Sequence, residues 1–363
     1  MSNSLAAPNT KIHPDDEMFQ VALQTLKQED LARSGYFRQG AEIHETTIVQ
    51  IANWRFGKLA DVSKYLEFAC GYGRSTRFLV RELDPSKVWV SDIYTEAVAF
   101  QEDNFHVNGF ASVTDPDKLV CETNFDLIFV ASLFTHLPEA RFEAWLKRLY
   151  SMLSSRGVLA FSVHDEVLAA GRTIPKSGML FLAESESQSL GKVEYGTNIV
   201  TEGYVRSAIA KAAGPNWKYH REPKALCGAH DVYLVSGSVD EDFSGFRYHK
   251  PLVGYCDEIL EISGATIQIS GWAGEPNDGF DVDEIQIFLD GTLVGVGKAE
   301  LPRSDVVKAL GQPKYANSGW RIEFSRSMAC QEPAMIEVRV RSQSGATTMI
   351  HIGPLNSSKK APE

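Results

Sequence analysis

Two kinds of hydrophobic pattern alternate between residues 63 and 236. Short apolar runs typical of buried strands are separated by stretches in which apolar residues recur every three or four positions, as on one face of a helix. The run FDLIFVAS at 125–132 is almost wholly apolar, as expected of a strand covered on both faces. The alternation predicts an α/β fold: a doubly wound, Rossmann-like parallel sheet with helices on both faces.

The regions on either side have different patterns. Residues 15–59 show helical spacing of apolar positions around an expected break at Ser34-Gly35. After about residue 237, apolar and polar residues alternate with period two, and Asp290-Gly291 suits a tight hairpin turn, which predicts a C-terminal antiparallel β-sandwich. The expected division is a helical N-terminal segment at 1–59, the α/β domain at 60–237, a linker at 238–257, the sandwich at 258–354 and a disordered tail at 355–363.

Composition removes several classes of partner. The formal net charge of -11 argues against nucleic acid or an anionic membrane as the main partner, since both reward clustered Lys and Arg. The five cysteines form no CxxC pair and no metal-binding set is evident, so we expect free thiols in a reducing compartment and no metal. The sequence shows neither a secretory leader nor a run of about 18 apolar residues. We therefore expect a cytoplasmic protein without membrane insertion.

The segment YLEFACGYGR at 65–74 carries candidate chemistry, because Glu67 ends a predicted strand and Gly71 and Gly73 lie in the turn that follows. A dinucleotide site needs the spacing G-x-G-x-x-G to accept a pyrophosphate, and this turn does not supply it. S-adenosylmethionine carries an ammonium and a sulfonium, which a carboxylate complements directly. Asp92, at the end of the next predicted strand, can accept the ribose hydroxyls of either ligand, so it does not discriminate between them.

The chain resembles the class I S-adenosylmethionine-dependent methyltransferases over residues 60 to about 236. LEFACGYGRST is similar to their first motif, E/D-x-G-x-G-x-G, although Ala69 stands in place of the first glycine. SDIY resembles the acidic end of their second strand, FDLIFVASLFTHLPE the fourth strand and its loop, and LKRLYSMLSSRGVLAFSVH the helix and fifth strand that follow. The resemblance implies S-adenosyl-L-methionine as cofactor.

The resemblance also implies which residues bind that cofactor. The methionine end would be lined by the turn after the first strand, the ribose would meet Asp92, and the adenine would meet Ile93 and either Asp115 or Asp117. The full set of implied cofactor-binding residues is Glu67, Ala69, Cys70, Gly71, Gly73, Arg74, Asp92, Ile93, Asp115, Asp117, Ala131, Ser132 and Leu133.

Catalysis and acceptor binding are less closely defined. A hydroxyl acceptor must lose a proton, and histidine is the natural base near neutral pH. His136 and His164 both follow strands at the ligand end of the sheet. A structural or cofactor-facing role is favoured over catalysis for His136, whereas His164 with Asp165 resembles an oriented base. Acceptor contacts are expected from the N-terminal segment, as a cap on the acceptor side, and from the insertion at 165–200. The candidates are Tyr36, Arg38, His44, Tyr195 and Asn198, each of which could instead serve in packing or lie on the surface.

The C-terminal pattern GWA, FLDG, RSDVVKALG and NSGWRIEF resembles immunoglobulin-like accessory domains of bacterial polysaccharide-assembly enzymes. That resemblance implies a sugar or glycan acceptor and association with such enzymes. Trp272 and Trp320 could stack on a sugar, although packing in the sandwich core is the favoured interpretation. The predicted function is O-methylation of a glycan or small hydroxylated metabolite; the alternatives are N- or carboxyl-methylation, a non-catalytic scaffold with a vestigial pocket and, more distantly, a dehydrogenase. The sequence is compatible with a homo-oligomer.

Overall fold

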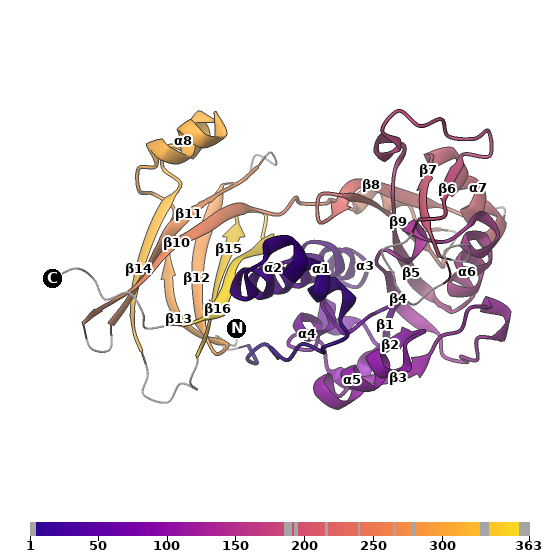
Figure 1. The fold of residues 1–363 in the computed structure, drawn as a ribbon, viewed down its shortest axis with the longest axis horizontal. Coiled ribbons are helices and arrows are strands. Elements are labelled where there is room, and N and C mark those ends of the chain that lie inside the picture. Colours follow the sequence, from indigo (N-terminus) through magenta and orange to yellow (C-terminus); the bar gives the residue numbers. More distant parts are fainter. Residues whose placement is uncertain are drawn as a thin grey trace.

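The computed structural model describes residues 5–184, 191, 195–214, 217–238, 240–263, 266–276, 281–326 and 334–355. An α/β unit and a β-sandwich lie at opposite ends of the molecule, with helices α1, α2 and α3 between them (Figure 1). No helix within these ranges is long and apolar enough to span a membrane. Cys70, Cys121, Cys227 and Cys256 are free thiols, while Cys330 and residues 356–363 of the predicted tail lie outside the described residues.

A seven-stranded sheet forms the α/β unit, in the order β3-β2-β1-β4-β5-β9-β8. The first five strands of this order are parallel, which confirms the predicted fold class, whereas β9 and β8 pair antiparallel at one edge. The chain changes direction between β1 and β4, where ligands of such sheets bind. The strands are β1 (Tyr65–Phe68), β2 (Val88–Asp92), β3 (Asn108–Ala111), β4 (Phe125–Val130), β5 (Leu153–Val163), β8 (Tyr219–Leu226) and β9 (His230–Ser236).

Two apolar clusters cover the two faces of this sheet. Strand β4 is buried along almost its whole length, as the continuous apolar run predicts. Helix α6 buries the predicted face of Phe142, Trp145, Leu146 and Leu149. The flanking helices are α4 (Thr76–Leu79), α5 (Thr95–Phe105), α6 (Glu139–Ser151) and α7 (Glu202–Ala213), and β6 (Met179–Leu182) pairs with β7 (Thr197–Val200) in the insertion.

The N-terminal region consists of α1 (Glu17–Leu26), α2 (Glu29–Glu42), the π-helix η1 (Ile43–Ile48) and α3 (Val49–Phe56). The break expected at Ser34-Gly35 is wrong, because α2 runs through these residues and the chain instead turns at Lys27, whose φ is 54°. A Cβ on Gly35 would lie 3.8 Å from the Leu26 side chain, so this glycine lies where the end of α1 faces α2. All six residues of η1 are buried.

The C-terminal region is a β-sandwich of two antiparallel sheets, as predicted. The first contains β10 (Val253–Ser263), β11 (Thr266–Gly274) and β14 (Gly319–Ser325); the second contains β12 (Val282–Leu289), β13 (Thr292–Gly297), β15 (Met335–Ser342) and β16 (Thr347–Pro354), and α8 (Ser304–Leu310) lies outside them. Trp320 is 1% exposed in the shared core, which agrees with packing rather than sugar stacking.

A separate apolar cluster joins the sandwich to the N-terminal helices. Met349 and Ile352 of β16 pack in it with Tyr36 and Phe37 of α2 and with Phe78 of α4. Because α4 follows the glycine turn of the α/β unit, the two ends of the molecule share this core. The sandwich therefore packs close to the segment that leads out of β1.

Candidate active site

A cavity of about 630 Å³ opens at the carboxyl ends of β1, β2 and β4, where the strand order switches. The cavity walls come from the turn after β1, the loops after β2, β3 and β4, and the start of α1. Of the residues predicted from sequence, the following line it: Tyr36, Glu67, Ala69, Cys70, Gly71, Arg74, Asp92, Ile93, Ala131, Ser132, Leu133, His136 and Tyr195.

Three residues of the turn after β1 adopt the left-handed backbone region, with φ of 57° at Ala69, 52° at Gly71 and 76° at Gly73. Glycine accepts this conformation without steric cost, so the alanine at 69 is the strained member. A Cβ on Gly71 would meet no atom within 4 Å, whereas one on Gly73 would lie 2.4 Å from Phe105. Gly71 thus leaves room beside the cavity, and Gly73 permits close packing of the turn on α5.

Glu67 lies at the inner end of the cavity and is 4% exposed. Its carboxylate accepts hydrogen bonds from the hydroxyls of Ser75 and of Thr76, the latter at 2.8 Å. Burial raises the pKa of Glu67, and the two hydroxyl hydrogen bonds oppose that shift. Sequence reasoning did not single out these hydroxyls, although their place at the start of the predicted helix after the glycine turn was a usable signal.

Asp92, at the end of the neighbouring strand β2, is hydrogen-bonded to the glycine turn that follows β1. Its carboxylate accepts the backbone N–H of Gly71 at 2.8 Å and that of Tyr94 at 3.0 Å. Burial raises the pKa of Asp92, while these N–H groups oppose the shift. The side chain of Gln101, which sequence reasoning missed, donates to the Gly71 carbonyl at 2.7 Å. Both backbone polar groups of Gly71 are therefore fixed before any ligand binds.

The two aspartates predicted for the adenine side do not line the cavity. Asp115 lies 3.5 Å from Arg141 and 3.8 Å from Lys118, and Asp117 is exposed. The cavity wall in this region is formed by Ser112, Val113 and Thr114. Arg141, which pairs with Asp115, also lines the cavity.

His136 lines the cavity and stacks on Tyr195, with ring centroids 4.6 Å apart. Its Nδ1 lies 2.7 Å from the carbonyl oxygen of Gly196. Because a carbonyl only accepts, Nδ1 carries the proton of the neutral ring and Nε2 presents the lone pair. This tautomer suits a general base at Nε2.

His164 lies behind His136, with ring centroids 6.3 Å apart, and does not line the cavity. Its Nδ1 is 3.1 Å from the Asn198 carbonyl, and its ring meets His230 edge-on at 4.6 Å. Burial, reinforced by His164 and His136, lowers the pKa of His230 to about 4, so this ring is neutral at pH 7. Asp165, the predicted partner of His164, lies 3.4 Å from the Lys224 ammonium.

Only some of the predicted acceptor-binding residues line the cofactor cavity. Tyr36 and Tyr195 line the cavity, and Tyr36 donates its hydroxyl hydrogen to Asp16. Arg38 lines a different cavity of about 500 Å³ between α2 and the sandwich, together with Trp272.

Two of the five candidates have buried side chains outside the cavity. His44 lies 3.1 Å from Glu82. Asn198 donates to the carbonyls of Phe134 and Leu137 at 2.8 and 2.6 Å, so its amide holds the loop that carries His136. Residues 185–190 and 192–194 of the insertion lie outside the described residues.

Sequence reasoning missed a wall of this cavity formed by Asp15, Asp16, Glu17 and Met18. These residues precede α1 or begin it, and no motif marks them. Tyr72 and Trp145 are among the other lining residues that were not predicted. In the described part of the chain, no group of three or more His, Cys, Asp or Glu side chains could hold a metal ion.

The cavity suits a sulfonium nucleoside better than a dinucleotide. Its volume lies in the usual range for small-molecule sites. The Glu67 carboxylate lies beside Ser75 and Thr76 at the first turn of α4, where the pyrophosphate of a dinucleotide would bind. Its negative charge would repel that pyrophosphate. The open space at Gly71 leaves room for a ribose, and the carboxylate of Asp92 offers a hydrogen-bond acceptor for its hydroxyls.

Comparison with known proteins gives one family match and a number of similar solved structures. Residues 66–159 match the family model described as "Methyltransferase domain". Similar solved structures include an S-adenosylmethionine-dependent methyltransferase from Clostridium acetobutylicum ATCC 824, with 15% identity, TM-score 0.40, and coverage of 60% of this chain and 97% of that one. Magnesium protoporphyrin IX methyltransferase from Synechocystis PCC 6803 gives 12% identity, TM-score 0.41, and coverage of 61% and 95%.

A further similar structure is the N-terminal domain of EvdMO1 in the presence of SAH and D-fucose, with 16% identity, TM-score 0.39, and coverage of 53% of this chain and 82% of that one. No curated protein matches the chain significantly. The assignment therefore rests on the family model and on the residues of the cavity. Residues 66–159 match a methyltransferase domain, and S-adenosylmethionine is the cofactor that this match and the cavity residues support.

Proposed function

We propose that the protein transfers a methyl group from S-adenosylmethionine to a hydroxyl group of a sugar, a glycan or a small hydroxylated metabolite. The observation that carries the proposal is His136, a cavity-lining histidine whose Nδ1 is occupied by the Gly196 carbonyl and whose Nε2 holds the lone pair. A hydroxyl acceptor needs such a base, since it must lose its proton as the new bond forms.

Each part of the cavity has a role in this reaction. Glu67 and the turn after β1 would hold the methionine end of the cofactor, and Asp92 would accept from the ribose hydroxyls. When bound, S-adenosylmethionine supplies a methyl group on a positively charged sulfur. The apolar side chains of Leu133, Leu137 and Trp145 line the cavity and would limit the access of water to the bound cofactor, which would favour loss of that charge.

The proton balance assigns one role to His136. In this reaction the acceptor oxygen would gain the methyl group that the sulfonium of the cofactor gives up, and the hydroxyl proton would pass to His136 Nε2. The Gly196 carbonyl stabilises the resulting imidazolium, because it accepts from Nδ1 in both states. His164 and His230 lie behind His136 and would not touch the acceptor.

The choice of a sugar-like acceptor is supported by the C-terminal sandwich alone. Its motifs resemble accessory domains of polysaccharide-assembly enzymes, and the likeness to an immunoglobulin-like fold stays a prediction. Trp272, which is half-buried, and Tyr315 line the cavity between α2 and the sandwich and would be the aromatic side chains for a glycan to stack on.

The test is to incubate the full-length protein with methyl-labelled S-adenosylmethionine and a panel of sugars, glycans and small hydroxylated metabolites, and to identify the labelled product. Replacement His136→Asn should lower turnover about 10² to 10⁴-fold, the usual contribution of a general base. Its affinity for S-adenosylhomocysteine should stay within about threefold of wild type. Full turnover in His136→Asn would show that His136 is not the general base. Absence of heat when S-adenosylmethionine is added in calorimetry would instead favour a non-catalytic scaffold.

N-methylation is the second candidate, and the carboxylates in the cavity wall favour it. Asp15, Asp16, Glu17 and Glu96 line the cavity and would attract an amine-bearing, cationic acceptor. An amine acceptor can react as its neutral form and needs no histidine base. Labelled amine products, made equally well by wild type and His136→Asn, would identify this reaction.

A further inference from the structure

Residues 5–18, which we call the N-terminal strap, run from the sandwich to the cofactor cavity. At one end, the backbone N–H of Leu5 donates to the carbonyl of Gly291 at 2.9 Å, in the turn between β12 and β13. At the other end, Asp15, Asp16, Glu17 and Met18 line the cavity. Figure 1 shows the described chain starting at the base of the sandwich and passing α4 before it enters α1.

Two arginines four residues apart hold the strap by its backbone. Arg81 donates from Nε to the carbonyl of Ala6 at 2.7 Å. Arg77 donates from Nη1 to the carbonyls of Asn9 and Lys11, both at 2.9 Å. Because all three acceptors are main-chain oxygens, the arginines fix the path of the strap whatever its side chains are.

Arg77 also binds the cofactor turn directly. Its Nε donates to the carbonyl of Gly73 at 3.0 Å, and Nη2 donates to that of Tyr72 at 3.3 Å. The guanidinium is 1% exposed and lies over the rings of Tyr36 and Phe37. One side chain therefore joins the strap to the glycine turn that leads out of β1.

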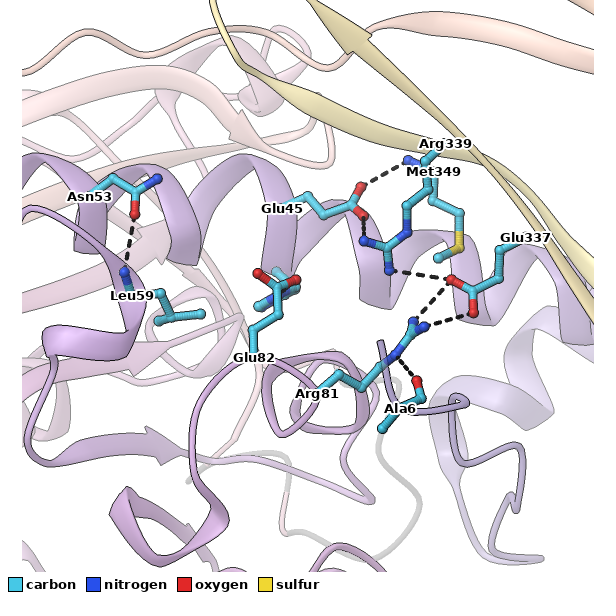
Figure 2. Close-up of polar contacts among 10 residues, drawn as sticks. Ala6, Glu45, Asn53, Leu59, Arg81, Glu82, Glu337, Arg339 and Met349 are labelled. Atoms are coloured by element: carbon cyan, nitrogen blue, oxygen red, sulfur yellow. Dashed lines mark hydrogen bonds and ion pairs between the residues drawn. The ribbon is translucent and has the colours of Figure 1, made fainter. Parts of the chain in front are cut away.

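Arg81 joins the strap to the sandwich. It binds the Glu337 carboxylate through two hydrogen bonds of 3.0 and 2.8 Å, and the two side chains are 3% and 0% exposed. Figure 2 shows the ion pairs continuing from Glu337 to Arg339 and from Arg339 to Glu45, each at 3.3 Å. A buried pair of this kind holds its two side chains in one relative position, since displacing either partner leaves a buried charge without its counter-ion.

The far end of the strap meets the cavity through specific contacts. The His13 ring stacks on Tyr72, with centroids 4.4 Å apart and planes 9° apart, and Tyr72 lines the cavity. Asp16 accepts from the hydroxyl of Tyr36, which also lines it. The position of this wall therefore depends on the path of residues 5–12.

We propose that Arg77 and Arg81 are positioning residues for the cofactor site. They hold the N-terminal strap so that residues 13–18 form one wall of the cavity, and the sandwich fixes Arg81 through Glu337. The sandwich thereby contributes to cofactor binding although its strands are absent from the cavity lining. The inference rests on S-adenosylmethionine as the ligand of this cavity, but not on which acceptor is methylated.

The test compares full-length variants by hydrogen exchange of residues 5–18 and by calorimetry with S-adenosylhomocysteine. Arg81→Lys keeps the buried charge but loses the bidentate geometry, and Leu5→Pro removes the N–H that binds Gly291 while leaving both arginines in place. Arg33→Lys, at an exposed arginine of α2 that pairs with Glu29, is the matched control.

In the wild type, S-adenosylhomocysteine should slow exchange of the strap. Both Arg81→Lys and Leu5→Pro should exchange faster at residues 5–12 and bind S-adenosylhomocysteine about tenfold more weakly, with Arg33→Lys like wild type. Affinity within about threefold of wild type and unchanged exchange in the strap would overturn the inference. Should Arg81→Lys not fold, Arg77→Lys, which removes the Nη1 contacts with the carbonyls of Asn9 and Lys11, replaces it in the comparison.

These outcomes separate the inference from the proposed function. If the variants behave as expected but no hydroxyl acceptor is methylated, the proposed reaction is wrong and the positioning role stands. If hydroxyl methylation is found while the strap variants bind and exchange like wild type, the positioning role is wrong and the reaction stands.

Discussion

The carboxylate of Asp92 accepts a hydrogen bond of 2.8 Å from the backbone N–H of Gly71, a residue 21 positions earlier in the chain. Strands β1 and β2 are neighbours in the sheet, so the end of one side chain reaches the turn after the other strand. The same carboxylate lines the cofactor cavity. One side chain thus shapes the glycine turn and lines the cavity, and we propose that it also binds the ribose.

Replacement Asp92→Ala should weaken binding of S-adenosylhomocysteine strongly. Loss of hydrogen bonds to a charged acceptor costs roughly 1.5 to 3 kcal/mol each, and every 1.4 kcal/mol is about tenfold in affinity. Calorimetry measures the change. Asp84→Ala is the control, because Asp84 also accepts a backbone N–H, from Ser86 at 2.9 Å, but lies outside the cavity. Equal affinities of the two variants would show that Asp92 does not meet the cofactor.

Replacement Glu67→Gln should separate stability from binding. The pKa of Glu67 is raised in the folded state. Its favourable contribution to the free energy of unfolding is therefore present below the pKa of the unfolded chain and is lost as pH rises through the pKa of the folded state. At pH 8 the ionised side chain therefore disfavours folding, and Glu67→Gln should keep or increase the Tm while weakening S-adenosylhomocysteine binding. Thermal unfolding and calorimetry at pH 8 give both quantities.

The control for Glu67→Gln is Glu122→Gln, at an exposed glutamate, which should change neither quantity. Binding by Glu67→Gln should also vary less with pH than binding by wild type, whose affinity should rise as pH rises through the pKa of Glu67. A Glu67→Gln variant that binds as tightly as wild type at every pH would contradict a role for the carboxylate.

Acid should destabilise the protein through two histidines. Burial lowers the pKa of both His230 and His351 from 6.5 to about 4. Their contributions to the free energy of unfolding are present above the pKa of the unfolded chain. They are lost as pH falls from about 6.5 through about 4, because in that range the unfolded chain binds more protons than the folded protein. Each loss should be of the order of 1 kcal/mol after allowance for partial solvent exposure.

Urea unfolding at pH 7 and pH 4.5 checks this expectation. His351→Gln should lose less stability than wild type over that interval, since the titrating group has been removed. His106→Asn, at an exposed histidine, is the control and should follow wild type. An identical loss in wild type and His351→Gln would show that His351 is not responsible.

The Arg81–Glu337 pair should make a large contribution once one partner is removed. Glu337→Gln leaves the buried guanidinium without its bidentate charged partner and should lower the free energy of unfolding by about 3 to 5 kcal/mol. The double replacement Arg81→Met with Glu337→Leu should recover part of that loss, because no isolated charge remains. Urea unfolding measures both.

The exposed pair Arg33–Glu29, at 3.1 Å, provides the comparison for the buried one. Glu29→Gln should change the free energy of unfolding by about 1 kcal/mol or less, as is usual for surface pairs. A Glu337→Gln variant no less stable than Glu29→Gln would mean that the sandwich does not depend on this contact.

Local patterns in the sequence were enough to predict the two halves of the fold. Continuous apolar runs such as 125–132 identify strands buried on both faces, and period-two alternation identifies the strands of the sandwich. The turn after β1 was predictable because glycines mark backbone with positive φ. Asp92 ends β2, and Glu67 lies one residue before the end of β1, so both strands bring an acid to the cavity. Each of these signals depends on neighbouring residues only.

The sequence by itself determined the parallel strands, the glycine turn and the acids at their ends, because strand burial and backbone conformation are properties of short segments. Only the tertiary structure decided that His136 rather than His164 lines the cavity, and that Arg77 and Arg81 meet carbonyls about 70 residues earlier. These roles depend on partners that folding brings together from distant parts of the chain, and no local pattern specifies a distant partner.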